Sequence, residues 1–190
     1  GAGENLQIWT QGQGKYTSYW LPSFDDVNEK VIFNISVISK KKLAILSNGL
    51  EKSFLSKGNQ MTFNGNGVEK LVHYQMQKPM SSYLVMLAIG NFEKQLEVSK
   101  SGTPLEFYID KKDVTKFEPT FRYSRQIFDY LEQEIGVKYP WGMYRQVPVR
   151  DFLYAGMENT TSTIFAQDFV VDSIGFNDRN YINVNAHELA

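Results

Sequence analysis

The stretch Lys100-Ser101-Gly102-Thr103-Pro104 separates two parts of the sequence that have different hydrophobic patterns. Before it, from residue 6 to about residue 98, apolar and polar residues alternate as is typical of β-strands. After it, strand-like runs are mixed with a run of helical periodicity. Polar residues followed by proline are typical of a connection between folded parts. The sequence therefore predicts an α+β protein with two packed regions, residues 1–101 and residues 102–190.

The first region contains several strand-like runs. Residues 31–38 and 71–76 alternate between apolar and polar side chains. Asn64-Gly65-Asn66-Gly67 supplies two Asn-Gly pairs, which favour the positive φ angles of a tight hairpin. Residues 81–92 lack alternation, which fits either a strand buried on both faces or a short core helix. Gly90 and the β-branched neighbours favour the strand.

The second region mixes strands with helices. We expect strands at residues 105–109, 147–153 and 165–171. A helix should begin near Pro119 and end at Gly136, because proline suits the first helical turn and glycine the exit. Its apolar positions at helical spacing are Ile127, Phe128, Leu131 and Ile135. A last helix is expected from Asn183 onward.

Composition excludes some classes of function. The 190 residues carry 20 basic and 21 acidic side chains, so the chain is not a strongly basic nucleic-acid binder. The longest apolar run, residues 83–89, is far below the roughly 20 residues of a membrane-spanning helix. We therefore expect a soluble piece, and the absence of cysteine leaves cytoplasmic, periplasmic and secreted locations open.

The pair His187-Glu188 lies at the start of the predicted last helix. It matches the beginning of an H-E-x-x-H zinc motif, whose second histidine is due immediately after Ala190. In the full motif two histidines share a helix face and hold zinc, while the glutamate can deprotonate a water on the metal. The alternative is purely structural: Asn185 would be a helix N-cap with Glu188 as its capping-box partner, and His187 an ordinary half-buried imidazole.

Two further stretches draw attention. Ala155-Gly156-Met157-Glu158-Asn159 follows a predicted strand, and its small residues would let a ligand backbone approach closely. The alternative is a glycine turn that ends an edge strand. Thr10-Gln11-Gly12-Gln13, followed by the aromatic residues and Pro22 of residues 18–26, places polar amides beside an aromatic cluster, which is also typical of a loop packed on a core.

Together these motifs resemble the aminopeptidase N family of zinc metallopeptidases, the gluzincins that include leukotriene hydrolase. That family has a G-x-M-E-N motif ahead of H-E-x-x-H, and residues 155–159 precede His187 and Glu188 in that order. It also has a T-Q-x-E/Q motif followed by an aromatic, Pro and Asp segment, similar to residues 10–13 and 22–25. Residues 78–85 and 90–93 are similar to the stretch that ends the family's N-terminal domain.

The resemblance implies a fold and a metal. Residues 1–101 would be the later part of a β-rich N-terminal domain with saddle-like sheets. Residues 102–190 would be the first part of a thermolysin-like catalytic domain, truncated inside the zinc-binding helix. His187 would be the first ligand of one zinc ion, and Glu188 the general base. Because the second histidine, a downstream glutamate and a tyrosine are absent, we expect this piece alone to be inactive and metal-free or weakly loaded.

The resemblance also implies a substrate site. Glu158, with Gln13 beside it, would bind the free α-amine of the substrate, since a carboxylate and an ammonium form a strong charge-assisted pair. The backbone of Ala155, Gly156 and Met157 would line the bound peptide, and Asn159 would hold the loop. Ala155 departs from the family's usual glycine and would narrow the backbone approach by one methyl group.

The implied function of the full-length protein is zinc-dependent removal of N-terminal residues from peptides by a zinc-activated water. Its partners would be peptides with a free N-terminus and no nucleic acid, and we expect a monomer. Two alternatives stay open. The protein could be a non-catalytic family member that acts as a binding scaffold. It could also open epoxides on the same zinc, since Gln13 stands where many relatives carry glutamate. Side-chain preference and physiological substrate are not encoded in this piece.

Overall fold

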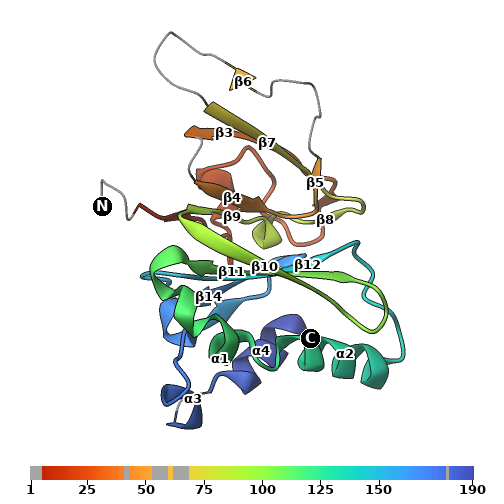
Figure 1. The fold of residues 1–190 in the computed structure, drawn as a ribbon. Helices are drawn as coiled ribbons and strands as arrows, with labels where there is room; N and C mark the ends of the chain where they lie inside the picture. Colours follow the sequence, from red (N-terminus) through yellow and green to blue (C-terminus); the bar gives the residue numbers. More distant parts are fainter. Residues whose placement is uncertain (1–5, 41–42, 53–59, 62–68, 179) are drawn as a thin grey trace. The chain divides into compact units, whose positions relative to one another are not determined.

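The computed structural model describes residues 6–40, 43–52, 60–61, 69–178 and 180–190 (Figure 1). The chain divides into two compact units, Gly1–Asn91 and Phe92–Ala190. The first unit is built from β-strands, and the second combines a mixed sheet with helices. The predicted α+β class and its order, β-rich first and mixed afterwards, are confirmed.

The described strands of the first unit pair antiparallel in small sheets. One sheet has the order β1 (Ile8–Trp9), β9 (Leu87–Gly90) and β4 (Ala44–Ser47). Another contains β3 (Asn34–Lys40), β7 (Glu69–Gln75), β5 (Leu50–Lys52) and β6 (Gln60–Met61). The short strands β2 (Lys30–Val31) and β8 (Met80–Ser81) form a pair, and η1 (Thr17–Tyr19) and η2 (Ser82–Leu84) are single 3-10 turns.

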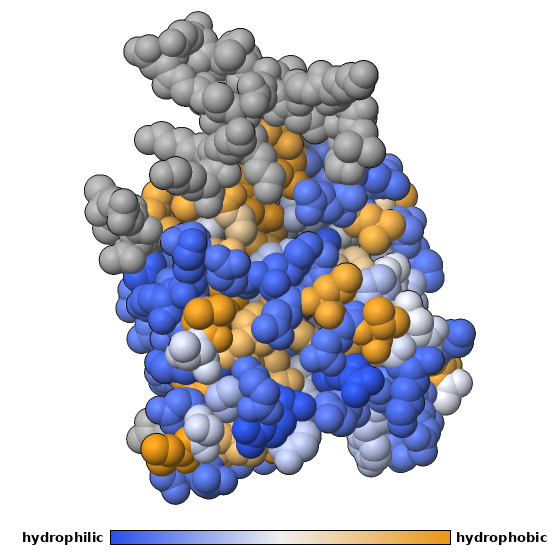
Figure 2. All heavy atoms as spheres, viewed as in Figure 1, coloured by the Kyte–Doolittle hydropathy of each residue, from blue (hydrophilic) through white to orange (hydrophobic). Residues whose placement is uncertain are grey.

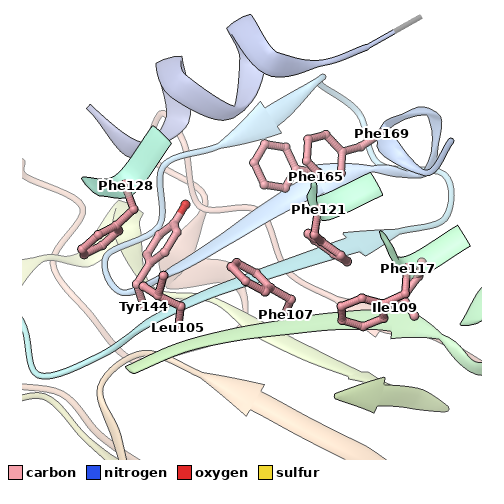
Figure 3. Close-up of a cluster of buried hydrophobic side chains, with 9 residues drawn as sticks. All are labelled: Leu105, Phe107, Ile109, Phe117, Phe121, Phe128, Tyr144, Phe165 and Phe169. Carbon is pink, nitrogen blue, oxygen red and sulfur yellow. The ribbon is translucent and has the colours of Figure 1, made fainter. Parts of the chain in front are cut away.

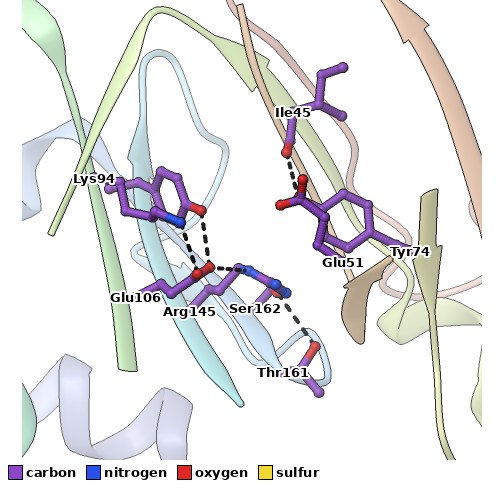
Figure 4. A network of polar contacts seen from close by, with 9 residues as sticks. Ile45, Glu51, Tyr74, Lys94, Glu106, Arg145, Thr161 and Ser162 are labelled. Carbon is purple, nitrogen blue, oxygen red and sulfur yellow. Dashed lines mark hydrogen bonds and ion pairs between the residues drawn. The ribbon is translucent and has the colours of Figure 1, made fainter. Parts of the chain in front are cut away.

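Apolar residues from two of these sheets form a buried cluster in the first unit. Ile45 and Ile89 pack with Val72 and Tyr74 of strand β7. The hydroxyl of buried Tyr74 donates a hydrogen bond to the Ile45 carbonyl at 2.7 Å (Figure 4). The predicted strand at 71–76 is therefore confirmed as β7, and the run 31–38 is divided between β2 and β3. The predicted hairpin at residues 64–67 lies outside the described residues.

The prediction of one continuous strand over residues 81–92 is wrong. A 3-10 turn, η2, separates β8 from β9. The Ser82 carbonyl accepts from the Thr17 hydroxyl at 3.0 Å, and the Met86 amide donates to the Asn48 side chain at 2.7 Å. Side chains from distant residues thus satisfy backbone groups that a continuous strand would pair with a neighbour. The hydrophobic pattern cannot report such partners.

The second unit contains a five-stranded sheet in the order β10-β11-β12-β14-β13. Its strands are β10 (Phe92–Val98), β11 (Pro104–Asp110), β12 (Tyr144–Val149), β13 (Gly156–Met157) and β14 (Ser162–Ala166). Strands β11, β12 and β14 run parallel, while the two edge strands β10 and β13 run antiparallel to their neighbours. The helical elements are η3 (Lys111–Lys116), α1 (Phe117–Phe121), α2 (Ser124–Ile135), η4 (Gln167–Phe169), α3 (Gly175–Asp178) and α4 (Ile182–Leu189).

The compact units divide earlier than the predicted domain boundary at 101/102. Strand β10 pairs with β11 along its whole length, from Phe92 opposite Asp110 to Val98 opposite Pro104. The predicted boundary therefore lies in the turn of this hairpin, where the Ser99 amide donates to the Thr103 carbonyl at 3.0 Å. The assignment of residues 1–101 and 102–190 to two domains stays a prediction.

Several predicted elements of the second unit are confirmed, with shifted ends. Strand β11 covers the predicted run 105–109, and α4 covers the predicted last helix. Gly136 ends α2 with a φ angle of 74°, as expected of a glycine at a helix exit. The helix predicted from Pro119 is divided into α1 and α2, and the strand predicted at 165–171 begins at Ser162 and gives way to η4.

Aromatic side chains fill the space between the sheet and its helices. The buried cluster consists of Leu105, Phe107, Ile109, Phe117, Phe121, Phe128, Tyr144, Phe165 and Phe169 (Figure 3). Phe165 and Phe169 stack with ring centroids 4.1 Å apart, and Phe107 stacks on Phe121 at 5.1 Å. Val184 and Leu189 of α4 pack against the same cluster. The aromatic core thereby holds α4 against the sheet.

Among the described residues on the face drawn in Figure 2, hydrophilic residues predominate and apolar residues show between them. Within the described part of the chain, helices fall short of the length and apolar character that crossing a bilayer requires.

A buried ion pair joins the neighbouring strands of the sheet on the face opposite to the aromatic cluster. Glu106 accepts from Arg145 Nε at 2.8 Å, from the Tyr108 hydroxyl at 3.0 Å and from Lys94 Nζ at 3.0 Å (Figure 4). Arg145 is only 2% exposed. Burial by itself raises the pKa of the Glu106 carboxyl, but Arg145 and Lys94 outweigh it and hold the pKa below its ordinary value of 4.5.

This ion pair predicts an acid-dependent part of the stability. We expect Glu106→Gln to lower the free energy of unfolding by about 2 kcal/mol near pH 7, because it leaves Arg145 buried without its anion. Because the Glu106 pKa is lower in the folded than in the unfolded protein, the ionised carboxylate stabilises the fold fully at pH values above the unfolded pKa. This stabilisation is lost as the pH falls through the folded pKa. Denaturation of wild type and variant should therefore differ near neutrality and converge below pH 4.5. A difference that stays constant in acid would contradict this origin.

Candidate active site

Helix α4 presents one face to the body of the second unit and another to solvent. Val184 and Leu189 pack against the aromatic cluster, and Asn185 is only 3% exposed. Glu188 is half-buried, whereas His187 is exposed. The interpretation of Asn185 as an N-cap is wrong: Tyr181 precedes the helix, and the backbone amide of Asn185 donates to the Tyr181 carbonyl at 2.8 Å. Residues 185–188 are therefore inside the helix.

The stretch 155–159 forms an edge of the sheet. Gly156 and Met157 make up β13, opposite Phe165 and Ile164 of β14, and the Ala155 carbonyl accepts from the Ala166 amide at 3.0 Å. The Met157 side chain is 1% exposed, while Ala155 and Glu158 are exposed. Among the described strands β13 has a partner on one side, so its other side can accept hydrogen bonds from an extended peptide.

Strand β13 and helix α4 meet at Gly156. A Cβ atom at this position would lie 2.6 Å from Oε1 of Glu188 and 2.6 Å from its Cγ. The backbone of β13 can therefore approach the Glu188 carboxylate this closely only because residue 156 is glycine. The contact brings together two motifs that lie about thirty residues apart in the sequence.

The local charges act on Glu188. Burial raises the pKa of its carboxyl, the nearby negative charge of Glu158 raises it further, and His187 acts in the opposite direction. Burial also raises the pKa of Tyr144 to about 12, with a contribution from the charge of Glu188. A carboxylate with a raised pKa is a stronger proton acceptor, which suits a general base.

Asn159 lies in the turn that follows β13. It is 2% exposed, and its Nδ2 donates weakly to the Met157 carbonyl at 3.4 Å. Its backbone carbonyl accepts from the Ser162 backbone amide at 3.0 Å. Its Oδ1 has no hydrogen-bond partner among the described residues. These contacts are compatible with the expected role of Asn159 in holding the loop.

Two models of known protein families match parts of this chain. Residues 1–84 match the peptidase M1 N-terminal domain, and residues 120–190 match the peptidase family M1 domain. The chain belongs to peptidase family M1. The predicted resemblance is thereby confirmed, and a β-rich region followed by a mixed sheet with helices is consistent with the N-terminal domain and the start of the catalytic domain of this family.

The relatives of this M1 chain include named aminopeptidases. The chain is 29% identical over 175 residues to glutamyl aminopeptidase of Homo sapiens, covering 88% of the chain and 17% of the relative. It is 29% identical over 173 residues to aminopeptidase 2 of Candida albicans, covering 89% and 18%. Aminopeptidase A of Gloydius brevicauda is 25% identical over 172 residues. The chain thus spans less than one fifth of the length of these relatives.

For two residues of the expected site, His187 and Gln13, the described part of the structure does not show the partners that the resemblance implies. Among the described residues no group of three or more His, Cys, Asp or Glu side chains could hold a metal ion. The exposed imidazole of His187 fits as one zinc ligand, but a protein zinc site uses three or four, so further donors are needed. Gln13 belongs to the first unit, where it is exposed and its backbone amide donates to Gln11 Oε1 at 3.0 Å. Its place beside Glu158 stays a prediction.

Sequence reasoning missed the polar residues that support α4. Tyr144, Gln146 and Asn185 are each at most 3% exposed. The burial of Asn185 could have been noticed, because Leu189 follows it at i+4 and so lies on the same face of the helix. Gln146 and Tyr144 carry no signal, since neighbouring positions on both faces of their strand are buried.

The contact at Gly156 predicts the outcome of adding one methyl group. We expect Gly156→Ala to displace the Glu188 carboxylate to a different rotamer while changing the free energy of unfolding by less than about 1 kcal/mol, since a flexible side-chain end can move aside. A crystal structure of the variant checks the displacement. Gly102→Ala is the control, because nothing lies within 4 Å of its added Cβ and only its φ of 93° is strained. An unmoved Glu188 would contradict the described contact.

Proposed function

We propose that the full-length protein is a zinc-dependent aminopeptidase that removes N-terminal residues from peptides. The contact between Gly156 and Glu188 carries this proposal, because it joins the G-x-M-E-N-like edge strand and the His187-Glu188 helix in one site. The named aminopeptidases among the relatives support the reaction class. The chain covers under one fifth of their length, so the proposed activity is that of the full-length protein.

His187 and Glu188 would have different roles in the reaction. His187 would supply one imidazole nitrogen to zinc, with the remaining ligands from outside this chain. Zinc, when bound, would polarise the scissile carbonyl and acidify a water. Glu188 would accept the proton of the attacking water and later pass it to the leaving amine, as its half-buried position beside Glu158 favours proton uptake.

Recognition would rest on β13 and the residue that follows it. The unpaired side of Gly156–Met157 would hydrogen-bond the substrate backbone as an added strand. Glu158 would bind the α-ammonium group, which orders the first peptide bond of the substrate toward Glu188. Gln13 would assist Glu158, and a substrate without a free amine would leave this carboxylate without a partner.

Removing the proposed base tests the reaction. In the full-length protein, Glu188→Gln should keep the fold and one zinc per chain but lower the rate of leucine- or alanine-anilide hydrolysis by about 10²–10⁴-fold. Glu134→Gln is a matched control on the exposed surface of α2 and should leave the rate unchanged. Metal analysis and steady-state kinetics check both. Wild type that binds no zinc and hydrolyses no anilide would sink the proposal and favour a binding scaffold.

Removing the proposed amine anchor tests recognition. Glu158→Gln should lower kcat/KM for peptides with a free N-terminus by about 10- to 100-fold, which is the size of one charge-assisted hydrogen bond. N-acetylated peptides should be poor substrates for both proteins, so the variant loses most of the discrimination between free and blocked termini. Paired assays on free and acetylated forms of one peptide measure this. Unchanged discrimination would place the amine anchor elsewhere.

A further inference from the structure

A buried chain of polar side chains ties α4 to two other elements of the second unit. Asn185 Nδ2 donates to Ser124 Oγ of α2 at 2.8 Å, and Asn185 Oδ1 accepts from Gln146 Nε2 of β12 at 2.7 Å. Ser124, Gln146 and Asn185 are 2%, 0% and 3% exposed. Helix α4 lies beside α2 (Figure 1). The side-chain amide of Asn185 therefore connects helix α4 to both α2 and β12.

An amide at this position is costly unless its partners are in place. Asn185 lies on the face of α4 whose neighbours Val184 and Leu189 pack against the aromatic cluster. Asparagine is a poorer helix former than leucine, and burying its amide requires hydrogen-bond partners for both ends. Here both ends are satisfied, each by a different element. A buried polar residue of this kind favours one register of packing over others.

The far end of the chain orients the Gln146 amide. Gln146 Nε2 also donates to the Tyr144 hydroxyl at 3.3 Å, and Tyr144 is hydrogen-bonded to Thr163 Oγ1 of β14 at 2.8 Å. Tyr144 and Thr163 are 3% and 1% exposed. The two acceptors of Gln146 Nε2, the Tyr144 hydroxyl and Asn185 Oδ1, orient this donor toward α4. Hydrogen bonds thereby connect the helix to the two central strands β12 and β14.

The position of Asn185 decides where the next residues point. At about 100° per residue, Glu188 follows Asn185 at roughly 300°, which places it on the adjoining part of the same face. His187 follows at roughly 200° and points away from the core, in agreement with its exposure. Sliding α4 by one turn would move it about 5.4 Å and leave buried amides without partners. The same movement would take the Glu188 carboxylate away from Gly156.

We propose that Asn185 is a positioning residue: its bonds to Ser124 and Gln146 set the register of α4 and so place Glu188 against β13. This inference rests on the proposed function for its effect on catalysis, but the register itself is a property of the fold. The apolar contacts that Val184 and Leu189 make with the aromatic cluster depend weakly on direction. The amide supplies a directional constraint that Val184 and Leu189 cannot.

The experiment separates register from stability in the full-length protein. Asn185→Leu should lower both the unfolding midpoint and kcat, because Gln146 and Ser124 lose a partner inside the core. In Asn185→Leu/Gln146→Leu the facing amide is also removed, and the unfolding midpoint should return toward the wild-type value. We expect kcat to stay about 10- to 100-fold low with KM changed less than about twofold, because Glu188 remains misplaced. Amide hydrogen exchange within α4 should remain about tenfold faster than in wild type.

Thr163→Val is the matched control. It removes a buried hydrogen bond of the same network, that between Thr163 and Tyr144, but leaves both acceptors of Gln146 Nε2, the Tyr144 hydroxyl and Asn185 Oδ1, in place. It should lower the unfolding midpoint while kcat and α4 exchange stay within about twofold of wild type. If the double variant regains kcat together with stability, or if Thr163→Val loses as much kcat, Asn185 is only a stabilising residue and the proposal is overturned.

Two further readouts keep the outcome decisive. Should wild type prove inactive toward anilides, the proposed function fails, yet α4 exchange still tests the register: faster exchange in the double variant than in Thr163→Val supports it, and equal exchange overturns it. Should the double variant not fold, Ser124→Ala removes only the partner on α2. That variant should speed α4 exchange relative to Thr163→Val, and no difference would overturn the proposal.

Discussion

The Glu188 carboxylate of helix α4 lies against the backbone of edge strand β13, in the space that a side chain at residue 156 would occupy. A methyl group there would overlap this carboxylate and displace it, so a single glycine determines where the Glu188 side chain lies. Other features of the site accompany this contact. The carboxyl of Glu188 becomes half-buried, the charge of Glu158 acts on it, and His187 is left on the exposed side of the helix. The small residue thus provides space, and the supporting elements determine what occupies it.

Those supporting elements combine two kinds of packing. The aromatic cluster holds the helices against the sheet through large apolar surfaces, with rings stacked at 4.1 and 5.1 Å. Such contacts are strong but tolerate small sliding, since dispersion depends weakly on direction. The polar contacts through Gln146 and Asn185 depend strongly on direction. The unit therefore gains its cohesion from the apolar cluster, and buried polar groups specify the relative placement of its elements.

The limits of sequence reasoning follow from the same distinction. The change from a β-rich to a mixed region, strand β11, the exit of α2 at Gly136 and helix α4 were predictable, because each depends on periodicity or on the conformational range of one residue. The two site motifs could be located by their order along the chain, and the roles of their residues stay predictions. The break at η2 was not, because it depends on bonds from Thr17 and Asn48, far away in the sequence. The burial of Asn185 was misread as capping for the same reason: its partners, Ser124 and Gln146, come from other elements.

The charges of the site explain why its proposed ligands are cations. Burial and the nearby charge of Glu158 raise the pKa of the Glu188 carboxyl, and His187 offsets this only in part. Two carboxylates beside one imidazole form an arrangement with excess negative charge, which a positive ligand stabilises. The α-ammonium of a peptide at Glu158 and a zinc ion at His187 would each supply such charge. With both present the repulsion would be offset, and Glu188 would be left to exchange protons beside the bond to be cleaved. The same carboxylate that lies in the space beside Gly156 would then be held at the reacting atoms by its neighbours, not by the substrate.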